Sequence, residues 1–341
     1  MTLPALMNAL VQLHDGYAGT QTGPNISDLS PLLAHQKIAV PQPKEGQALI
    51  KVHLAAVNPS DIHFIKGEYG QPRVKSVPAG FEAVGEVVAG DTPLKGQRVS
   101  FFASASGTWA EYALTDATTL VPCRPDLAEV DAAGQLVNPL TAIAMFDIVR
   151  ESGADSFVLN AAGSQLGKLL IALGRDHGIK PIAVVRRGAQ AAALKELGAA
   201  EVIVTGDPNP LDAAVAIFGK LKPRILLDAV GDQFTADLFF AMPSQARWVN
   251  YGKLSTEAPA LTELGQMIFR GKQIEGFWLT RWMKQVDPVR IPQAFVEIQE
   301  RFVSSQWITD VAGIVPLSQA MEKLPAVLAM PDGKAFIDPR L

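Results

Sequence analysis

The chain has 341 residues, of which 48% are hydrophobic and 19% charged, and its formal net charge is −4 at pH 7. This composition is typical of a globular protein with a large buried core, and the length allows about two domains. The acidic balance offers no basic surface for nucleic acid or for an anionic membrane. No apolar run reaches the roughly 18 residues that a membrane span needs. The N-terminus also lacks the basic start and long apolar run of a secretory signal, so we expect a cytoplasmic protein.

The first 125 residues contain short, Val-rich apolar runs that Gly and Pro interrupt, with little helical periodicity. The first run covers residues 7–13, and three more cover 47–57, 83–90 and 97–103. Such punctuation predicts a compact, mostly antiparallel β domain. The single cysteine, Cys123, excludes an internal disulfide and any multi-cysteine zinc site, and we interpret it as an inert thiol.

Residues 126–284 alternate apolar, β-rich runs with helical patterns. We expect six strands here, at residues 156–160, 182–187, 201–205, 224–230, 247–252 and 274–279. Continuous apolar strands separated by helices predict an α/β domain with a doubly wound parallel sheet of the Rossmann type. After a helix near 292–302, the tail returns to a strand, a helix and a strand. We expect residues 285–341 to complete the N-terminal domain.

A loop of small residues follows the first of these strands, in the sequence AAGSQLGKLL. Matched to the pattern G-x-G-x-x-G, its key positions are Ala162, Ser164 and Gly167, so two of the three glycines are replaced. The strand before the loop and the helix after it still predict a dinucleotide site, because a helix N-terminus offers free N–H groups to phosphates. We assign cofactor contacts to the whole loop: Ala162, Gly163, Ser164, Gln165, Leu166 and Gly167. A tight turn that binds no ligand is the alternative.

The end of the second strand of this domain indicates which dinucleotide binds. NAD enzymes carry an acid there, which accepts hydrogen bonds from the ribose hydroxyls. This chain has Arg186 and Arg187 instead. Guanidinium groups suit a 2′-phosphate, so the sequence favours NADPH. A solvated basic pair at a strand end is the alternative.

Several landmark motifs occur together: NPSD (residues 58–61), GFEAVGEVVAG (80–90), GTWAEY (107–112), NPLTA (138–142), DAVG (228–231) and GKAFI (333–337). With them the chain resembles the medium-chain dehydrogenase/reductase superfamily over nearly its whole length. The resemblance implies a GroES-like, mostly β catalytic domain formed by residues 1–125 and 285–341, and a Rossmann NADPH-binding domain formed by 126–284. It also implies a homodimer joined through the edge strand of the nucleotide domain.

Zinc-dependent members of this superfamily carry Cys at the position of Asn58 and His at the position of Phe81, directly before the acid matched by Glu82. Neither Asn nor Phe replaces these ligands, so the resemblance implies a zinc-independent branch without a metal site. Without a Lewis acid to polarise an alcohol or a carbonyl, alcohol dehydrogenation is disfavoured.

Two zinc-free branches resemble the chain. The stretches NPSDIHFIKGEYG, GTWAEY and IEGFWLTRW (274–282) are similar to the 2-enoyl thioester reductases of the mitochondrial fatty-acid-synthesis type, and the NADPH:quinone reductases are the alternative. A non-catalytic NADPH-binding regulator is a second alternative, from a different class. For an enoyl reductase the substrate is a small acyl thioester, and acyl-CoA and acyl carrier protein both stay open. Arg73 and Lys75 are the basic residues that a carrier protein could use.

The resemblance assigns the central role to Tyr69, whose neutral phenol would hydrogen-bond the enolate oxygen and pass on a proton. Asn58 would donate from its amide to the substrate or to the nicotinamide ribose, and Thr141 would contact the nicotinamide region. The structural alternatives are a turn tyrosine, an Asn-Pro turn residue and a helix-capping threonine. We interpret Asp61 and His63 as structural.

Further contacts are expected beyond the carboxyl ends of the last three strands, where doubly wound sheets bind ligands. Val230, Tyr251 and Gly252 should border the nicotinamide ribose. Phe277, Trp278 and Leu279 end the sixth expected strand and should hold the carboxamide or the substrate. Phe277 and Trp278 can equally be core or dimer-contact aromatics.

Overall fold

The computed structural model describes residues 3–103, 106–330 and 332–341. The chain forms two compact units, the first made of Met1–Asn138 with Phe295–Leu341 and the second of Pro139–Ala294. These boundaries lie later in the chain than the expected 126 and 284. One reason is that the helix α2 (Glu129–Gly134) packs on strands of the first unit. Within the described residues, no helix combines the length and the hydrophobicity needed to cross a membrane.

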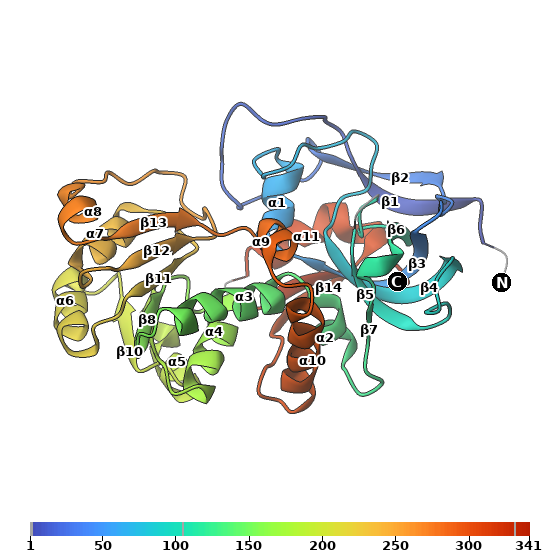
Figure 1. Cartoon of the computed structure of the whole chain (residues 1–341). Coiled ribbons are helices and arrows are strands. Elements are labelled where there is room, and N and C mark those ends of the chain that lie inside the picture. Colours follow the sequence, from blue (N-terminus) through green and yellow to red (C-terminus); the bar gives the residue numbers. More distant parts are fainter. Residues whose placement is uncertain (1–2, 104–105, 331) are drawn as a thin grey trace. The chain divides into compact units, whose positions relative to one another are not determined.

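The first unit is built mainly on antiparallel strands (Figure 1). Its elements besides α2 are β1 (Leu6–Gln12), β2 (Leu33–Ala39), β3 (Gln47–Val57), α1 (Pro59–Ile65), β4 (Glu82–Gly90), β5 (Arg98–Phe102), β6 (Tyr112–Asp116), β7 (Val121–Pro122), β14 (Val311–Pro316), α11 (Ala320–Leu328) and β15 (Lys334–Asp338). Seven strands form one sheet in the order β14-β15-β3-β4-β5-β7, with β6 paired to β3, and β1 pairs with β2. Every pair is antiparallel except β14 with β15, so the mostly antiparallel domain predicted from the sequence is confirmed.

The core of the first unit lies against β3, which is buried along most of its length. Trp109 is fully buried there, and its indole N–H donates to the carbonyl oxygen of Ala56 at 3.3 Å. Gly85 allows β4 to approach β3 closely, since a Cβ at this position would lie 2.2 Å from the carbonyl oxygen of Lys51. The close packing of β3 and β4 fixes the first residue of β4, the buried acid Glu82.

The C-terminal tail adds two strands to this sheet, in the strand–helix–strand order that the sequence predicts. β15 pairs antiparallel with the end of β3, with Ala335 opposite Val57. One step further, this register brings Lys334 to the level of Asn58. Residues far apart in the chain therefore meet at the point where β3 passes into α1.

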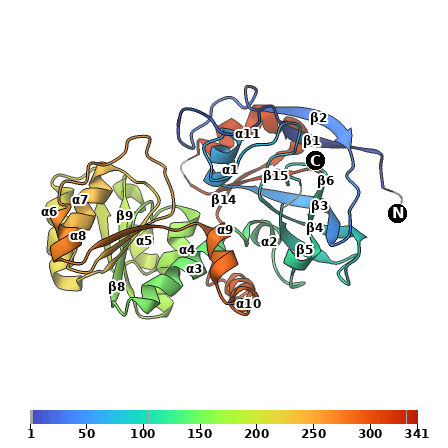
Figure 2. The same ribbon diagram turned by 45° about the horizontal axis from the view of Figure 1, so that its top comes forward.

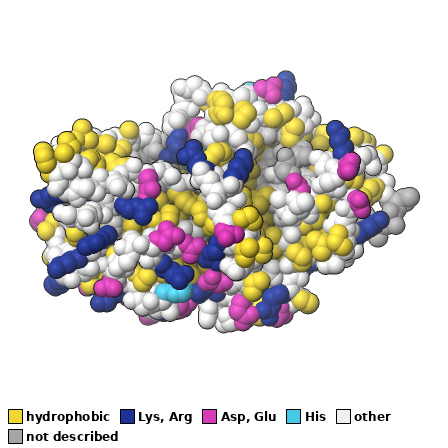
Figure 3. All heavy atoms as spheres, in the orientation of Figure 1, with side chains coloured by type: hydrophobic (Ala, Val, Ile, Leu, Met, Phe, Trp, Pro, Cys, Tyr) yellow, Lys and Arg dark blue, Asp and Glu magenta, His cyan; other side chains and the backbone are white. Residues whose placement is uncertain are grey.

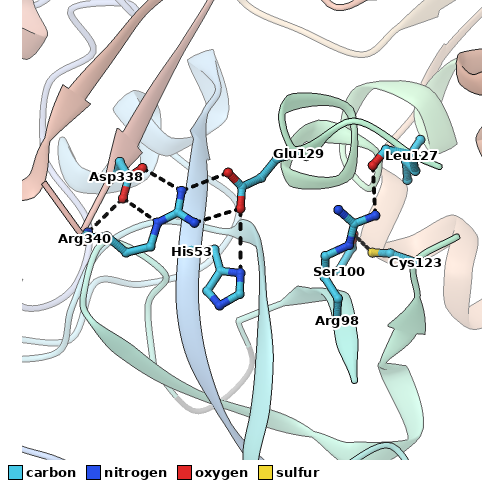
Figure 4. A network of polar contacts seen from close by, with 8 residues as sticks. All are labelled: His53, Arg98, Ser100, Cys123, Leu127, Glu129, Asp338 and Arg340. Carbon is cyan, nitrogen blue, oxygen red and sulfur yellow. Dashed lines mark hydrogen bonds and ion pairs between the residues drawn. The ribbon is translucent and has the colours of Figure 1, made fainter. Parts of the chain in front are cut away.

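Figure 4 shows how charged side chains join α2 to the C-terminus. The Arg340 guanidinium donates to both carboxylate oxygens of Glu129, at 3.0 and 2.8 Å, and also to Asp338. His53 on β3 lies 3.7 Å from Glu129 in the same network. Nearby, the Cys123 sulfur lies 3.2 Å from the Ser100 hydroxyl, and burial raises the pKa of this thiol, which agrees with an unreactive cysteine.

The second unit is a six-stranded parallel sheet with helices on its faces (Figures 1 and 2). Its elements are α3 (Asn138–Glu151), β8 (Ser156–Leu159), α4 (Gln165–Asp176), β9 (Lys180–Val185), α5 (Ala191–Leu197), β10 (Glu201–Val204), α6 (Pro210–Leu221), β11 (Ile225–Asp228), α7 (Gln233–Ala241), β12 (Arg247–Asn250), α8 (Gly265–Phe269), β13 (Gln273–Gly276) and α9 (Leu279–Gln285), and α10 (Arg290–Val303) spans the boundary. The strand order β10-β9-β8-β11-β12-β13 is that of a dinucleotide-binding Rossmann sheet. The predicted doubly wound fold is confirmed.

Each of the six expected strands is present, but all six end earlier than predicted. The clearest case is β13, which ends at Gly276, so Phe277 and Trp278 lie after the strand and Leu279 begins α9. Arg186 and Arg187 likewise follow β9 rather than belonging to it. The predicted strands are too long because the loops at the carboxyl edge of the sheet also contain apolar or basic residues. In the sequence, these loop residues cannot be told from the strand that precedes them.

Candidate active site

A buried polar cluster joins β3, β4 and β15 in the first unit. Lys334 donates from its ammonium to Asn58 Oδ1 at 2.5 Å and to Glu82 Oε1 at 3.2 Å. Asn58 in turn donates from its amide nitrogen to the same Glu82 oxygen at 2.9 Å. All three residues are at most 5% exposed. A buried carboxylate and a buried ammonium neutralise each other here, and the amide is fixed between them.

The other oxygen of Glu82 holds the chain just before α3. Glu82 Oε2 accepts hydrogen bonds from the backbone N–H groups of Leu136 at 3.0 Å and Val137 at 2.9 Å. With Asn58 and Lys334 on Oε1, the carboxylate therefore accepts from four donors. The Glu82 carboxylate has no solvent exposure, and these four donors replace the hydrogen bonds that water would otherwise supply.

Asp61 lies next to this cluster in the first turn of α1. Its Oδ2 accepts from the backbone N–H of Asn58 at 2.7 Å, which ties the start of the helix together. Asp61 is fully buried, and its Oδ1 has no hydrogen-bond partner among the described residues. Burial, together with the nearby Glu82 charge, raises the pKa of Asp61 to about 7, although the bond from Asn58 opposes this shift.

Tyr69 lies four residues after α1 and packs in an aromatic trio. Its ring centroid is 5.2 Å from that of Phe81 and 6.5 Å from that of Phe64, and the two phenylalanine rings are 5.1 Å apart. Tyr69 itself is half-buried, so its ring is packed while the residue keeps access to solvent. Aromatic packing of this kind fixes the direction in which a phenol points.

The small-residue loop of the second unit connects β8 to α4 as the sequence predicts. Ser164 is the N-cap of α4, and its hydroxyl accepts from the backbone N–H of Gly167 at 3.1 Å. A Cβ at Gly167 would lie 2.5 Å from the carbonyl oxygen of Ala162, so this glycine is needed for the helix to pack on the loop. Gln165 and Leu166 form the first turn of the helix. The arrangement matches a cradle for phosphate at a helix N-terminus.

The basic pair lies beside this loop in the fold. Arg186 and Arg187 are exposed directly after β9, and β9 is paired with β8. The segment that follows them reaches the loop, because a Cβ at Gly163 would lie 2.2 Å from the side-chain oxygen of Gln190. Neither arginine makes an ion pair within the part of the chain that the structure describes. The loop and the unpaired guanidinium groups together fit a dinucleotide that carries a 2′-phosphate.

Asp228 organises the carboxyl ends of three strands in the second unit. Its carboxylate accepts from the backbone N–H groups of Val230 and Gly231, and from the side chains of Asn160, Trp248 and Asn250. Gly231 has φ of +73°, a conformation that glycine adopts without strain. The Val230 turn, at the edge where such sheets bind ligands, is thereby held rigidly.

The next strand end carries an unusual tyrosine. The Tyr251 hydroxyl is buried and has no hydrogen-bond partner among the described residues. Burial, and to a lesser degree the Asp228 charge, raises the pKa of this phenol well above its usual value, so it stays a neutral donor. Gly252 follows, and a Cβ there would lie 2.7 Å from the carbonyl oxygen of Ala229. A buried donor without a partner fits a site that awaits a polar ligand group.

The remaining predicted residues take different positions. Thr141 is 7% exposed in the first turn of α3. Phe277 directly follows β13 and donates its backbone N–H to the carbonyl oxygen of Asn250 at 2.8 Å, and Trp278 is the N-cap residue of α9. Arg73, which we considered for a carrier-protein surface, is instead 9% exposed and donates to the carbonyl oxygens of Asp15, Gly16 and Ile65. It is a structural arginine.

Comparison with known proteins agrees with both units. Residues 44–126 match the family model of the alcohol dehydrogenase GroES-like domain, and residues 166–294 match that of the zinc-binding dehydrogenases. A Mesorhizobium loti protein, provisionally assigned as an NADPH:quinone reductase, has a crystal structure that is 46% identical, with a TM-score of 0.95 over 99% of this chain and 100% of that one. The mitochondrial enoyl-acyl-carrier-protein reductase of Dictyostelium discoideum is 31% identical over 70% of each chain. The Bos taurus enzyme of that name is 28% identical over 81% of this chain and 76% of its own.

The chain belongs to the medium-chain dehydrogenase/reductase superfamily. The family, and with it the oxidoreductase class, were predicted from the sequence and are confirmed. The GroES-like match includes Asn58 and Glu82, and the second match covers most of the Rossmann sheet.

A zinc ion, which the name of the second family model suggests, does not fit the residues of this chain. The amide oxygen of Asn58 is occupied by the Lys334 ammonium, and the Glu82 carboxylate beside it already accepts from four donors. Phe81, where zinc-dependent relatives carry a histidine, lies in the aromatic trio and offers no ligand atom. A fixed positive charge between the candidate ligands repels a divalent cation.

Sequence reasoning missed three residues that build the site. In the sequence, Lys334 stands out only as part of the motif GKAFI, Asn160 as the last residue of an expected strand, and Glu68 as a residue of the loop before Tyr69. The buried acid Glu82 was the available signal for the first, because a buried carboxylate needs a cation or several donors. Nothing in the sequence signals Asn160 or Glu68, since their partners are 68 and 46 residues away.

Proposed function

We propose that this superfamily member is an NADPH-dependent, zinc-independent reductase that adds hydride to an activated C=C bond, and that its substrate is a 2-enoyl thioester. Tyr69 carries this proposal. Its phenol packs in an aromatic trio with Phe81, which occupies a position where zinc-dependent relatives carry a metal ligand, and this contact supports the proposal that the phenol takes over the role of the Lewis acid. Relatives named as enoyl-acyl-carrier-protein reductases support the substrate class.

The chemistry needs a donor rather than a metal. When bound, NADPH supplies the hydride, which adds to the β-carbon of the conjugated C=C bond. The electron pair of that bond moves onto the thioester oxygen and forms an enolate, and protonation of the α-carbon then completes the reduction. Tyr69 donates a hydrogen bond to the enolate oxygen and stabilises the developing charge, and it can deliver the proton.

The contacts of Asn58 favour a structural role over the expected donation to the substrate or to the nicotinamide ribose. Its oxygen accepts from Lys334 and one of its N–H groups is used by Glu82, so we propose that it acts mainly by fixing the start of α1. Only its second amide N–H is left for a ligand within the described part of the chain. Thr141, Phe277, Trp278 and Leu279 stay predicted contacts of the nicotinamide or the substrate.

The second unit provides the coenzyme site in this proposal. The loop Ala162–Gly167 would hold the pyrophosphate at the N-terminus of α4, and Arg186 with Arg187 would hold the 2′-phosphate. The turn at Val230 and the buried hydroxyl of Tyr251 would border the nicotinamide ribose. The NADPH named for the 46% identical Mesorhizobium loti protein supports this assignment.

Quinone reduction is the second candidate, and that same protein supports it, because it is assigned as an NADPH:quinone reductase. The two activities are separated by offering chelator-treated protein crotonyl-CoA or 1,4-benzoquinone and following NADPH oxidation. We expect turnover with the thioester that exceeds turnover with the quinone. Turnover with the quinone alone would move the chain to the other branch. Tight NADPH binding with neither acceptor consumed would favour a regulator.

We propose that the chain forms a homodimer through β13, the edge strand of the second unit. β13 pairs only with β12 among the described strands, and an apolar patch lies beside it, made of Leu261, Leu264, Ile268, Phe269 and Ile274. Figure 3 shows these apolar side chains gathered over α8. Phe269 is 85% exposed, and an open edge beside such a patch favours pairing with a second copy of the same strand.

The cellular location and the acyl carrier stay predictions. Relatives named as mitochondrial do not decide where this chain works, so cytoplasmic location is a proposal to be tested by fractionation of cells that express a tagged full-length protein. Since Arg73 is buried, a carrier-protein surface cannot include it. Comparing crotonyl-CoA with crotonyl-acyl carrier protein as substrates distinguishes the two carriers.

A further inference from the structure

The loop between β1 and β2, residues 13–32, contains no helix and no named strand in the structure. Loops of this length without secondary structure are uncommon in compact domains and are often functional. One part of this loop, residues 22–25, is held by the charged side chains of Lys66 and Glu68, which lie three residues and one residue before Tyr69. The contact therefore links a long surface loop to the proposed proton donor.

Glu68 is the first of these side chains. Its Oε1 accepts from the backbone N–H of Thr22 at 2.6 Å and from the Thr22 hydroxyl at 2.9 Å, and its Oε2 accepts from the backbone N–H of Gly23 at 3.2 Å. His63 Nδ1 lies 3.3 Å from Oε2 on the other side. The side chain is only 2% exposed. A carboxylate with this many short contacts is fixed in one rotamer.

The ionised form of Glu68 is the one that fits these contacts. Burial alone would raise the pKa of the carboxyl, but the bonds from Thr22, His63 and Gly23 outweigh it and hold the pKa below its usual value. The carboxylate is therefore charged at neutral pH and accepts from every neighbour.

Lys66 completes the contact from the same turn. Its ammonium donates to the Thr22 hydroxyl at 3.1 Å and to the carbonyl oxygens of Gly23 at 2.7 Å and Asn25 at 2.6 Å. The donors of residues 22 and 23 are thus bound by Glu68, and the acceptors of residues 22, 23 and 25 are bound by Lys66. We call Lys66, Glu68 and residues 22–25 the loop clamp.

The backbone between these two side chains is fixed as well. Gly67 has φ of +75° and turns the chain out of α1, and its carbonyl oxygen accepts from the N–H of Ala18 at 2.9 Å. A Cβ at Gly67 would lie 2.6 Å from the Arg73 guanidinium carbon and 2.7 Å from the Ala18 nitrogen. The β1–β2 loop therefore contacts both the backbone and the side chains of the turn that leads to Tyr69.

We propose that Glu68 is a positioning residue for Tyr69, and that it acts by clamping residues 22–25 of the β1–β2 loop. This inference rests on the proposed function of Tyr69. The peptide bond between Glu68 and Tyr69 transmits the constraint, because fixing the Glu68 side chain and the Gly67 backbone leaves little freedom for the next residue. The phenol is then held in the orientation set by Phe64 and Phe81.

The test is a double-substitution cycle with Glu68→Ala and Tyr69→Phe, measured as crotonyl-CoA-dependent NADPH oxidation. Misplacing a catalytic group by about 1 Å costs on the order of 100-fold in rate, so we expect Glu68→Ala to lower kcat by roughly 10- to 100-fold with the KM for NADPH unchanged. The double variant should be no slower than Tyr69→Phe alone, because Glu68 acts only through Tyr69. Multiplying losses would overturn the proposal.

Two further variants show whether the contacts themselves matter. Thr22→Val removes the hydroxyl that both Glu68 and Lys66 contact, and it should lower kcat in the same direction but less than Glu68→Ala. Glu68→Gln keeps one acceptor oxygen and should recover part of the rate. Glu45→Ala, at an exposed glutamate outside the clamp, is the matched control and should leave kcat unchanged. An unchanged kcat in Glu68→Ala would contradict the positioning role.

Hydrogen–deuterium exchange separates failure of this inference from failure of the proposed function. In Glu68→Ala, backbone amides of residues 17–25 and 64–70 should exchange faster together, whereas Glu45→Ala should leave both segments unchanged. If no thioester is reduced but the two segments loosen together, the proposed function fails and the clamp stands. If the thioester is reduced and exchange of residues 64–70 does not change in Glu68→Ala, the clamp is overturned.

Discussion

The ammonium of Lys334 lies 2.5 Å from the amide oxygen of Asn58, at the position where zinc-dependent relatives coordinate a metal with a cysteine. The contact joins residues that are 276 positions apart in the chain. With Glu82, the two residues form a hydrogen-bonded cluster in which the atoms that could bind a metal are already occupied. The first unit therefore has the fold of its superfamily, but at this position it has hydrogen-bonded side chains in place of metal ligands.

Removing the Lys334 charge should destabilise the first unit. In Lys334→Met, Glu82 stays buried with two backbone donors and one amide but without its counter-charge, so we expect the free energy of unfolding to fall by about 3–5 kcal/mol. Chemical denaturation followed by far-UV circular dichroism measures it. Lys95→Met, at an exposed lysine, is the control and should change stability by at most about 0.5 kcal/mol. Adding Glu82→Gln to Lys334→Met should restore part of the loss, and an equal or larger loss in the double variant would contradict the ion-pair account.

Asp61 should make stability depend on pH. Because its pKa is raised to about 7 by burial, its protonated form favours the folded state, and this contribution is complete below about pH 4 and lost as pH rises through 7. The shift from 3.8 to about 7 corresponds to at most about 4 kcal/mol. Asp61→Asn removes the titrating group, so the stability of the variant relative to the natural protein should increase from pH 5 to pH 8. Chemical denaturation of both proteins in parallel over this pH range measures the difference. If the free energy of unfolding had the same pH dependence in both proteins, the raised pKa of Asp61 would be contradicted.

The basic pair should set the coenzyme preference. Replacing Arg186 and Arg187 with Ala removes two charged donors to the 2′-phosphate, so the KM for NADPH should rise by about 10- to 100-fold while that for NADH changes little. Steady-state kinetics with both coenzymes measures this split. Arg224→Ala, at an exposed arginine before the amino end of β11, is the matched control. Equal losses with both coenzymes would show that the pair does not contact the phosphate.

The apolar patch should hold the proposed dimer together. Phe269→Asp places a charge in the centre of the patch beside β13, so we expect a monomer in light scattering at concentrations where the natural protein is a dimer. Val215→Asp, at a residue of α6 that is 51% exposed and outside the patch, should leave the dimer intact. A natural protein that elutes as a monomer, or a dimer that survives Phe269→Asp, would remove the edge-strand proposal.

The nucleotide-binding half of the fold could be predicted from the sequence because its strands are continuous apolar runs. β8 and β11 are buried at every position, and such runs have few alternatives to a covered parallel sheet. The strand ends were less predictable. The expected strand at 274–279 owes most of its apolar character to Phe277, Trp278 and Leu279, but β13 itself has the sequence QIEG and stops at Gly276, before these residues.

The ionic contacts of the first unit were not predictable from spacing. Arg73 and Lys334 look like ordinary surface cations in the sequence, and both are buried because distant segments supply their acceptors. Pairing of β15 with β3 creates one of these contacts, and the β1–β2 loop creates the other. A single sequence carries no signal for contacts of this range, whereas its motifs were enough to predict Tyr69 and the small-residue loop as candidate site residues.

The most direct test of the account follows the atoms of the reaction. Chelator-treated protein is incubated with crotonyl-CoA and NADPH that carries deuterium at both C4 positions, and in a second experiment with unlabelled NADPH in deuterated water. Mass spectrometry of the product should show butyryl-CoA with one deuterium at C3 in the first case and one at C2 in the second, with product formation slowed strongly in Tyr69→Phe. Oxidation of NADPH without a labelled thioester product, or full activity of Tyr69→Phe, would contradict enoyl reduction by this site.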